Sequence, residues 1–232
     1  AQLLASELQI FHHNVQRRNT GRLFIQHALH VLGRVLRDRR ARAEILEEVR
    51  SISQGGDLLS PNGAVFSRHD LKNMVKLESA VTEMNRLTTA PMVPRRALKD
   101  TTLELRSGTY RFDAGHDLAL FPPTTHLDPE IYEDPYDFRF DRFLPDSGGA
   151  PARFWKDGQR VHFNLLPFGA GVSMCPGRFF AINEFKIAVA VLLSCFDIEL
   201  LTTAVPKQDV SRTGFGTLPP VDDVPFRYRR RA

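Results

Sequence analysis

The stretch Asn164-Leu165-Leu166-Pro167-Phe168-Gly169-Ala170-Gly171-Val172-Ser173-Met174-Cys175-Pro176-Gly177-Arg178 decides the fold of this chain. It leads directly into an apolar run, 179–196, that predicts a helix. Gly169 and Gly171 allow the backbone a positive φ or a close approach to a flat ligand. Pro176 suits the first turn of the expected helix. We therefore expect Cys175 at a helix N-terminus, where free N–H groups and the positive end of the helix dipole favour a thiolate.

Two interpretations of Cys175 are open. A thiolate on an open turn, cleared by glycines, is what an axial haem ligand requires. The alternative is a buried free cysteine in front of a core helix. The pattern Phe-x-x-Gly-x-x-x-Cys-x-Gly is complete at Phe168, Gly171, Cys175 and Gly177. Four fixed positions together favour the haem ligand.

Composition sets the outer limits. The chain has 232 residues, 42% hydrophobic and 25% charged, which is typical of a globular protein of one or two domains. The net charge of +4 is too small to indicate nucleic acid, and no nucleic-acid partner is expected. Two cysteines cannot form a disulfide framework, which favours a reducing compartment. No run approaches the length of a transmembrane helix.

Hydrophobic spacing predicts helices at 23–36 and 43–52, with a solvated turn over the charged run 37–42. One longer helix is predicted from Ser67 to about Leu87, opened by a Ser67 N-cap. Glu83 and Arg86 share a face of that helix, and taken alone they are a surface ion pair of little energetic value.

Short strands are predicted between this helix and the cysteine. Extended backbone is expected at 88–94, a hairpin at 101–105 and 109–112, and a further strand at 117–121. After the helix predicted over 179–196, residues 198–201 are expected to be a strand and 211–220 a turn between extended segments. The fold is therefore mainly α with a small β region.

The cysteine pattern resembles the haem-binding loop of the cytochrome P-450 family, the haem-thiolate monooxygenases. From Ser67 to Tyr228 the chain is similar to the C-terminal half of that fold. The family resemblance implies a K helix, a β region, a meander, the cysteine loop, an L helix and a C-terminal hairpin over 67–232. Residues 1–66 match it poorly, so 1–232 is expected to be a partial domain. His126-Leu127-Asp128-Pro129-Glu130-Ile131-Tyr132 and Cys175-Pro176-Gly177-Arg178 are most similar to the branch of sterol 7-alpha- and 12-alpha-hydroxylases and prostacyclin synthase.

The resemblance assigns roles to individual residues. Cys175 would be the axial ligand of haem b iron. Glu83 and Arg86 would be a buried structural pair, joined by Arg142 from the segment 138–143. Arg95 would reach a haem propionate, although two exposed arginines at 95 and 96 on an edge strand are an equal alternative. Other implied positions are the haem-loop residues Phe168, Gly171 and Gly177, the distal candidates Asn19 and Thr20, and the substrate-pocket candidates Thr213, Gly214 and Phe215, for which a plain surface turn is as good an interpretation.

Two features depart from the family pattern. Ser173 stands where most members carry a basic residue, so one propionate contact is missing. Arginines 17, 18 and 22 surround Asn19 and Thr20, where a distal pocket needs apolar walls. A metal site from His126, Asp128 and Asp134 is discounted, because proline and aspartate there build capped turns.

The function implied is a monooxygenase that inserts one oxygen atom from O2 into a hydrophobic sterol-like or lipid-like substrate. Electrons would come from NADPH through a reductase, at the cytosolic face of the endoplasmic reticulum, although this chain shows no anchor. Two alternatives stay open: a haem-thiolate isomerase of the prostacyclin synthase kind, and a truncated fragment that binds haem without turnover. We expect the 232 residues alone not to turn over substrate.

Overall fold

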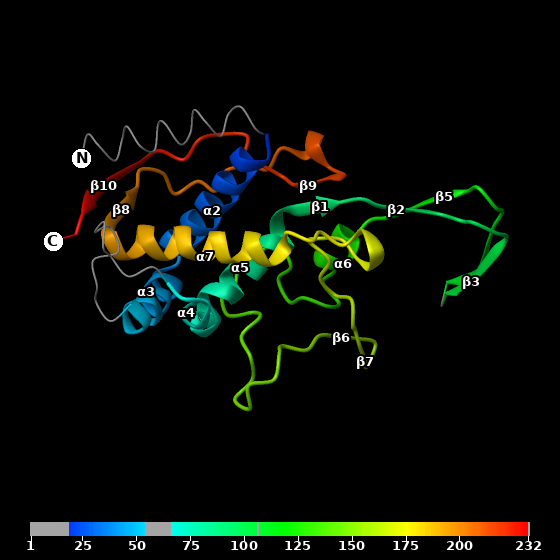
Figure 1. The fold of residues 1–232 in the computed structure, drawn as a ribbon, viewed down its shortest axis with the longest axis horizontal. Helices are drawn as coiled ribbons and strands as arrows, with labels where there is room; N and C mark the ends of the chain where they lie inside the picture. Colours follow the sequence, from blue (N-terminus) through cyan, green and yellow to red (C-terminus); the bar gives the residue numbers. More distant parts are fainter. Residues whose placement is uncertain (1–18, 54–65, 106, 232) are drawn as a thin grey trace.

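The computed structural model describes residues 19–53, 66–105 and 107–231, without the side chains of residues 19–24 and 173 (Figure 1). The parts of the expected N-terminal helical segment at 1–18 and 54–65 lie outside the described residues. Within the described residues, helices make up the body of the molecule and the strands are short. The expected class, mainly α with a small β region, is confirmed.

The first two described helices are α2 (Asn19–Arg37) and α3 (Arg39–Ser53). Only Asp38 separates them, and its Oδ1 accepts a hydrogen bond of 3.0 Å from the backbone nitrogen of Ala41. The carboxylate thus satisfies a free N–H group at the start of α3. The solvated turn expected over 37–42 is therefore wrong, since this cap lets the helix begin within the charged run.

The single helix expected from Ser67 to Leu87 is two helices, α4 (Arg68–Asn73) and α5 (Val75–Thr88). Met74 between them has φ −78° and ψ 66°, which is not helical. Both oxygens of Glu48, on α3, accept from the first backbone nitrogens of α5, at 2.8 Å and 3.0 Å. A carboxylate from another helix caps α5, so a second start is stabilised there.

Helix α7 (Arg178–Cys195) is the apolar run after the cysteine, as expected. It lies across α2, α3 and α5 and forms the centre of the body (Figure 1). Its neighbours contact it on several sides, which explains why apolar residues occur around most of its circumference. The fully buried core side chains include Val31, Val35, Ile45, Val49, Met74, Leu77, Val81 and Val189.

The described strands form five antiparallel pairs. These are β1 (Thr89–Pro91) with β9 (Phe215–Thr217), β2 (Val93–Arg96) with β5 (Asp117–Leu120), β3 (Thr101–Leu105) with β4 (Gly108–Phe112), β6 (Trp155–Lys156) with β7 (Gln159–Arg160), and β8 (Phe196–Leu200) with β10 (Phe226–Arg230). The expected hairpin and strands are present. Strands β2 to β5, residues 93–120, form an arm that reaches away from the helices (Figure 1).

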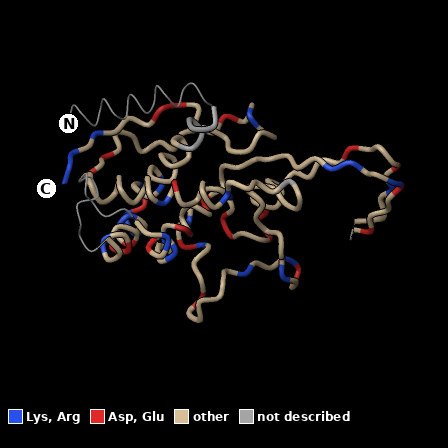
Figure 2. The backbone as a smooth tube through the Cα atoms, in the orientation of Figure 1, with Lys and Arg blue, Asp and Glu red and all other residues tan. Residues whose placement is uncertain are grey.

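Charge is unevenly spread over this fold. Charged residues concentrate on α3, on α4 and on strand β10, whereas the loop 164–177 carries none (Figure 2). Within the described residues, no helix has the length and apolar character needed to cross a bilayer.

Candidate functional site

Cys175 lies on a loop, residues 164–177, that leads into α7. The loop contacts His126 at the end of the short helix α6 (Pro123–His126). The backbone nitrogen of Cys175 donates to the carbonyl of Phe168 at 3.0 Å. The turn inside the loop is closed by a bond of 3.2 Å from the Gly169 nitrogen to the Leu166 carbonyl. Gly169 and Gly171 have φ of 74° and 63°, where a side chain would be strained. The loop presents Cys175 as an exposed free thiol.

The start of α7 differs from the expectation in one detail. The helix begins at Arg178, so Pro176 precedes its first turn instead of belonging to it. Gly177 is the cap, and the carbonyl of Cys175 accepts from the backbone nitrogen of Arg178 at 3.4 Å and from its Nη1 at 3.1 Å. Pro176 and Gly177 serve as the connecting turn. The thiol therefore stands just ahead of the helix.

Exposed apolar side chains flank Cys175 in the sequence, and the Arg178 guanidinium lies 4.3 Å from the centre of the Phe179 ring. Val172 is fully exposed, and Phe179 and Phe180 are exposed by 66% and 64%. Met174, next to Cys175, is also exposed. Apolar side chains gathered on a surface indicate that another apolar body covers them. Together with one accessible thiol, this surface fits a flat apolar cofactor such as haem, with sulfur as its ligand.

Arg95 on β2 reaches this loop from 75 positions upstream. Its Nη2 donates to the carbonyl of Ala170 at 2.7 Å. A Cβ added at Gly171 would lie 3.4 Å from the same nitrogen, in van der Waals contact with the guanidinium. Arg96 is oriented differently, because it pairs in two contacts of 2.8 Å with Asp117 on the arm. The structure thus brings Arg95, and not Arg96, to the cysteine loop.

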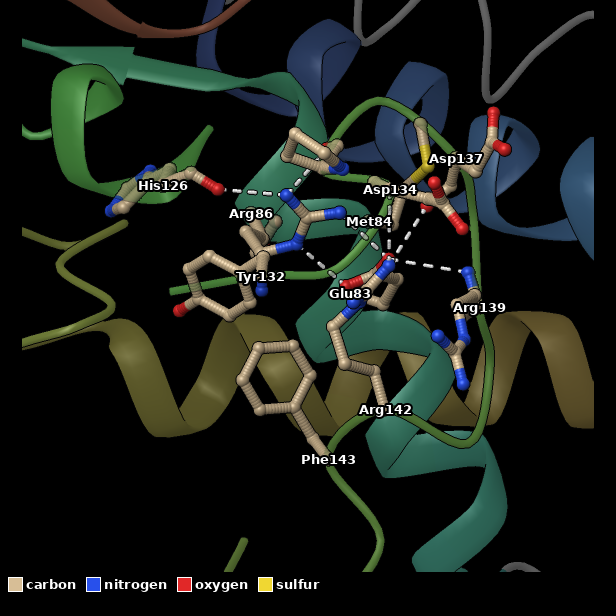
Figure 3. A network of polar contacts seen from close by, with 12 residues as sticks. Glu83, Met84, Arg86, His126, Tyr132, Asp134, Asp137, Arg139, Arg142 and Phe143 are labelled. Carbon is tan, nitrogen blue, oxygen red and sulfur yellow. Dashed lines mark hydrogen bonds and ion pairs between the residues drawn. The ribbon is translucent and has the colours of Figure 1, made fainter. Parts of the chain in front are cut away.

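The residues Glu83, Arg86 and Arg142 meet in one contact network (Figure 3). Arg86 forms a two-pronged pair with the Glu83 carboxylate, at 2.7 Å and 2.8 Å. Arg142 Nε lies 3.0 Å from Glu83 Oε1, and the backbone nitrogen of Arg139 donates to the same oxygen. The Glu83 and Arg86 side chains are fully buried. A buried carboxylate held by two guanidiniums has its lone pairs satisfied, which is the condition for its survival away from water.

A second group of residues surrounds this network. Arg86 Nη1 donates to the carbonyl of His126 at 2.7 Å, and its guanidinium lies 4.8 Å from the centre of the Tyr132 ring. The Tyr132 hydroxyl donates to the carbonyl of Asn164 at 3.1 Å, and burial raises the pKa of Tyr132 to about 12. Among the described residues, no group of three or more His, Cys, Asp or Glu side chains is placed to hold a metal ion. His126 Nε2 accepts from the backbone nitrogen of Leu166 at 2.9 Å, which connects the residue to the cysteine loop.

The remaining candidates lie elsewhere. Asn19 and Thr20 begin α2, and their side chains are outside the description. Gly214 has φ 97° and donates to the carbonyl of Ala90 at 2.7 Å, which fixes the turn beside β1. Phe215 follows it with its side chain 79% exposed, and the Thr213 hydroxyl is used within its own turn.

Three buried polar residues had no place in the sequence interpretation. Lys186 on α7 is buried, contacts the carbonyl of Leu71 and lies 2.7 Å from Glu78 Oε2. His27 and His30 on α2 are also buried, and the His27 ring centre is 4.6 Å from that of Phe185. A lone lysine in an apolar helix and histidines at helical spacing on an apolar face are signals that could have marked them.

Comparisons with known proteins agree with this geometry. The family model described as Cytochrome P450 matches residues 28–226. Cytochrome P450 7A1 of Rattus norvegicus is 38% identical over 203 residues, covering 85% of this chain and 40% of the relative. The 7-alpha-hydroxycholest-4-en-3-one 12-alpha-hydroxylase of Homo sapiens is 40% identical, covering 80% and 38%. The cytochrome P450DA heme domain superposes with a TM-score of 0.67 at 24% identity, over 90% of this chain and 41% of that structure. The chain thus spans about two fifths of the length of the proteins it matches.

Proposed function

The chain belongs to the cytochrome P450 family, and on that premise we propose that Cys175 binds a haem iron as a thiolate in a monooxygenase that hydroxylates sterol-like substrates. The observation that carries this proposal is the exposed Cys175 on a loop with two positive-φ glycines, in a segment whose apolar residues Val172, Phe179 and Phe180 are also exposed. The hydroxylase names of the matched relatives support the reaction class.

Each residue has a defined task in this proposal. Cys175 Sγ would hold the haem iron as a thiolate ligand, and bound haem would supply the chemistry that inserts an oxygen atom from O2 into a C–H bond. The apolar surface of Val172, Phe179 and Phe180 packs against the cofactor and excludes water from the thiolate. Arg95, already at the loop, offers its guanidinium to a haem propionate, where a charged pair is favourable. At Gly177 an added Cβ would lie 3.8 Å from Cys175 Sγ, so a glycine at this position leaves space beside the sulfur.

The wider assignment follows the family. Electrons come from NADPH through a reductase, and the protein acts at the cytosolic face of the endoplasmic reticulum membrane on a hydrophobic substrate. Residues 67–232 form the C-terminal part of the domain, with Thr213, Gly214 and Phe215 at the edge of the substrate pocket. Phe215, apolar and exposed, is the side chain of that turn best suited to contact a sterol.

The experiment combines the haem-reconstituted protein with a reductase, NADPH and a sterol panel. Hydroxylated product that requires both NADPH and O2 supports the proposal. Rearrangement of an added lipid peroxide without NADPH would replace it with the isomerase, and haem binding without either reaction would make the chain a non-catalytic fragment. A Cys175→Ser variant is the matched control for haem ligation in each arm.

A further inference from the structure

His126 connects two parts of the molecule through opposite ends of one residue. It ends helix α6 and is fully buried. Its carbonyl accepts from Arg86 Nη1 at 2.7 Å, within the Glu83 network. Its ring nitrogen Nε2 accepts from the backbone nitrogen of Leu166 at 2.9 Å. Figure 3 shows the carbonyl directed at Arg86 and the ring directed away from it.

The Leu166 contact lies at the base of the cysteine loop. The Leu166 carbonyl accepts from the Gly169 nitrogen at 3.2 Å, and the Phe168 carbonyl accepts from the Cys175 nitrogen at 3.0 Å. Fixing the nitrogen of Leu166 therefore fixes the residue whose carbonyl closes the turn. The turn sets the position of Phe168, whose carbonyl accepts the backbone hydrogen bond from Cys175.

We propose that His126 is a positioning residue for the thiolate ligand: its imidazole, anchored through its own backbone by Arg86, holds Leu166 and thereby the register of the loop that carries Cys175. This inference rests on the proposed function of Cys175. It gives the buried ion network a consequence at the haem site, since Arg86 holds His126 and His126 holds the loop.

The protonation state of His126 is the one that this role requires. Burial lowers the pKa of His126 to about 4, and the nearby Arg86 guanidinium lowers it further against a backbone contact that raises it. At neutral pH the imidazole is uncharged, and in the tautomer that carries its proton on Nδ1 the Nε2 lone pair accepts the N–H of Leu166. In a protonated ring Nε2 would carry a hydrogen, so it could no longer accept the N–H of Leu166.

Tyr132 makes a second, parallel contact two residues earlier in the loop. Its hydroxyl donates to the carbonyl of Asn164 at 3.1 Å, and Asn164 Nδ2 donates back to the hydroxyl oxygen at 2.9 Å. The Tyr132 ring packs against Arg86. The segment 164–166 is thus held at both ends by residues that contact the same guanidinium.

The test uses three variants of the haem-reconstituted chain. His126→Leu removes the acceptor and leaves the N–H of Leu166 unpaired, whereas His126→Gln can present an amide oxygen in its place. His116→Leu is the matched control, because His116 Nδ1 also accepts a backbone N–H, from Asp113 at 3.1 Å, but on the exposed arm.

Two quantities are measured: amide hydrogen exchange in residues 164–175, and the fraction of thiolate-type signal in the ferrous carbonyl spectrum. In His126→Leu we expect exchange at Leu166 to rise on the order of tenfold, as for the loss of one partner of a half-buried donor. We also expect a shift of the spectrum from the thiolate type toward the type of a protonated or dissociated thiol. His126→Gln is expected to restore both, and His116→Leu to change neither.

The outcomes separate this inference from the proposed function. A wild-type protein without a thiolate-type spectrum overturns the function itself. A wild-type protein with that spectrum, and a His126→Leu variant equal to it in spectrum and in exchange, overturns the role of His126 alone. Should His126→Leu not fold, Tyr132→Phe decides, because it keeps the ring packing and loses only the hydroxyl contacts to Asn164: faster exchange at 164–166 supports the two-point anchor, and unchanged exchange contradicts it.

Discussion

Glu83 and Arg142 are 59 positions apart in sequence, yet Arg142 Nε lies 3.0 Å from Glu83 Oε1. The contact ties the irregular segment 138–143 to helix α5. Because Glu83 is fully buried, its charge must be compensated inside the protein, and the guanidiniums of Arg86 and Arg142 and the backbone nitrogen of Arg139 contact it directly. The network thus connects helix α5 to a segment without regular structure.

Replacing Glu83 with alanine should lower the free energy of unfolding by about 3–5 kcal/mol, because two guanidiniums would be left without their carboxylate. Urea denaturation measures the change, and soluble yield and haem incorporation should fall with it. Glu199→Ala is the matched control, since Glu199 pairs with Arg227 at the surface and should cost less than about 1 kcal/mol. Equal stabilities of the two variants would show that the buried network has no special role.

Lys186 on α7 is a second buried charged residue that is held by polar contacts. Lys186→Met should destabilise the protein by about 1–3 kcal/mol, since the carbonyl of Leu71 loses its donor, while the half-exposed Glu78 can be hydrated. Thermal or urea unfolding measures the loss. Lys72→Met, on the exposed side of α4, should stay within about 0.5 kcal/mol of the wild type. A stable Lys186→Met protein would mean that packing alone holds α4 against α7.

Acid should destabilise the fold through three buried histidines. Burial lowers the pKa of His27 to about 3, and those of His30 and His126 to about 4. The unfolded state has a histidine pKa near ~6.5 and so binds protons first as the pH falls. Stability is then complete above about pH 6.5 and declines toward pH 4, by about 1.4 kcal/mol per pH unit for each histidine.

The measurement is urea unfolding from pH 7.5 to 5. His27→Gln should reduce the slope by about one histidine's share, and the exposed His162→Gln should leave it unchanged. A flat profile, or an equal effect of both substitutions, would contradict the burial of neutral histidines in α2.

Arg95 and Arg96 offer a test of the haem edge. Arg95→Leu should weaken haem retention on the order of tenfold, because a charge-assisted contact is worth about 1.5–3 kcal/mol. Arg96→Leu should not, since Arg96 pairs with Asp117 on the arm. Transfer of haem to excess apomyoglobin measures the retention of each variant. Equal transfer rates would remove Arg95 from the site.

Local chemistry made part of this structure predictable. The positive φ at Gly169 and Gly171, the helix after Arg178 and the hairpin closed at Gly108 follow from residue types in a short window. The placement of Arg142 beside Glu83 did not follow from its surroundings and came from the resemblance alone.

Long-range contacts explain what the sequence did not show. Met74 favours a helix, and α4 and α5 separate there because Glu48 from α3 supplies a cap. Adjacent residues on a strand point to opposite sides, so Arg95 and Arg96 could not be told apart until β2 was placed against the cysteine loop. Lys186 is buried although it is charged, and its partners Leu71 and Glu78 lie more than 100 positions upstream.

The measurement that tests the central claim most directly is the ferrous carbonyl spectrum of the haem-reconstituted protein, of Cys175→Ser and of Cys195→Ser. Cys195 is the other cysteine of the sequence, at the end of α7, and serves as the control. We predict a thiolate-type spectrum in the wild type and in Cys195→Ser, and its loss in Cys175→Ser. A thiolate-type spectrum that persists unchanged in Cys175→Ser would contradict the assignment of Cys175 as the haem ligand.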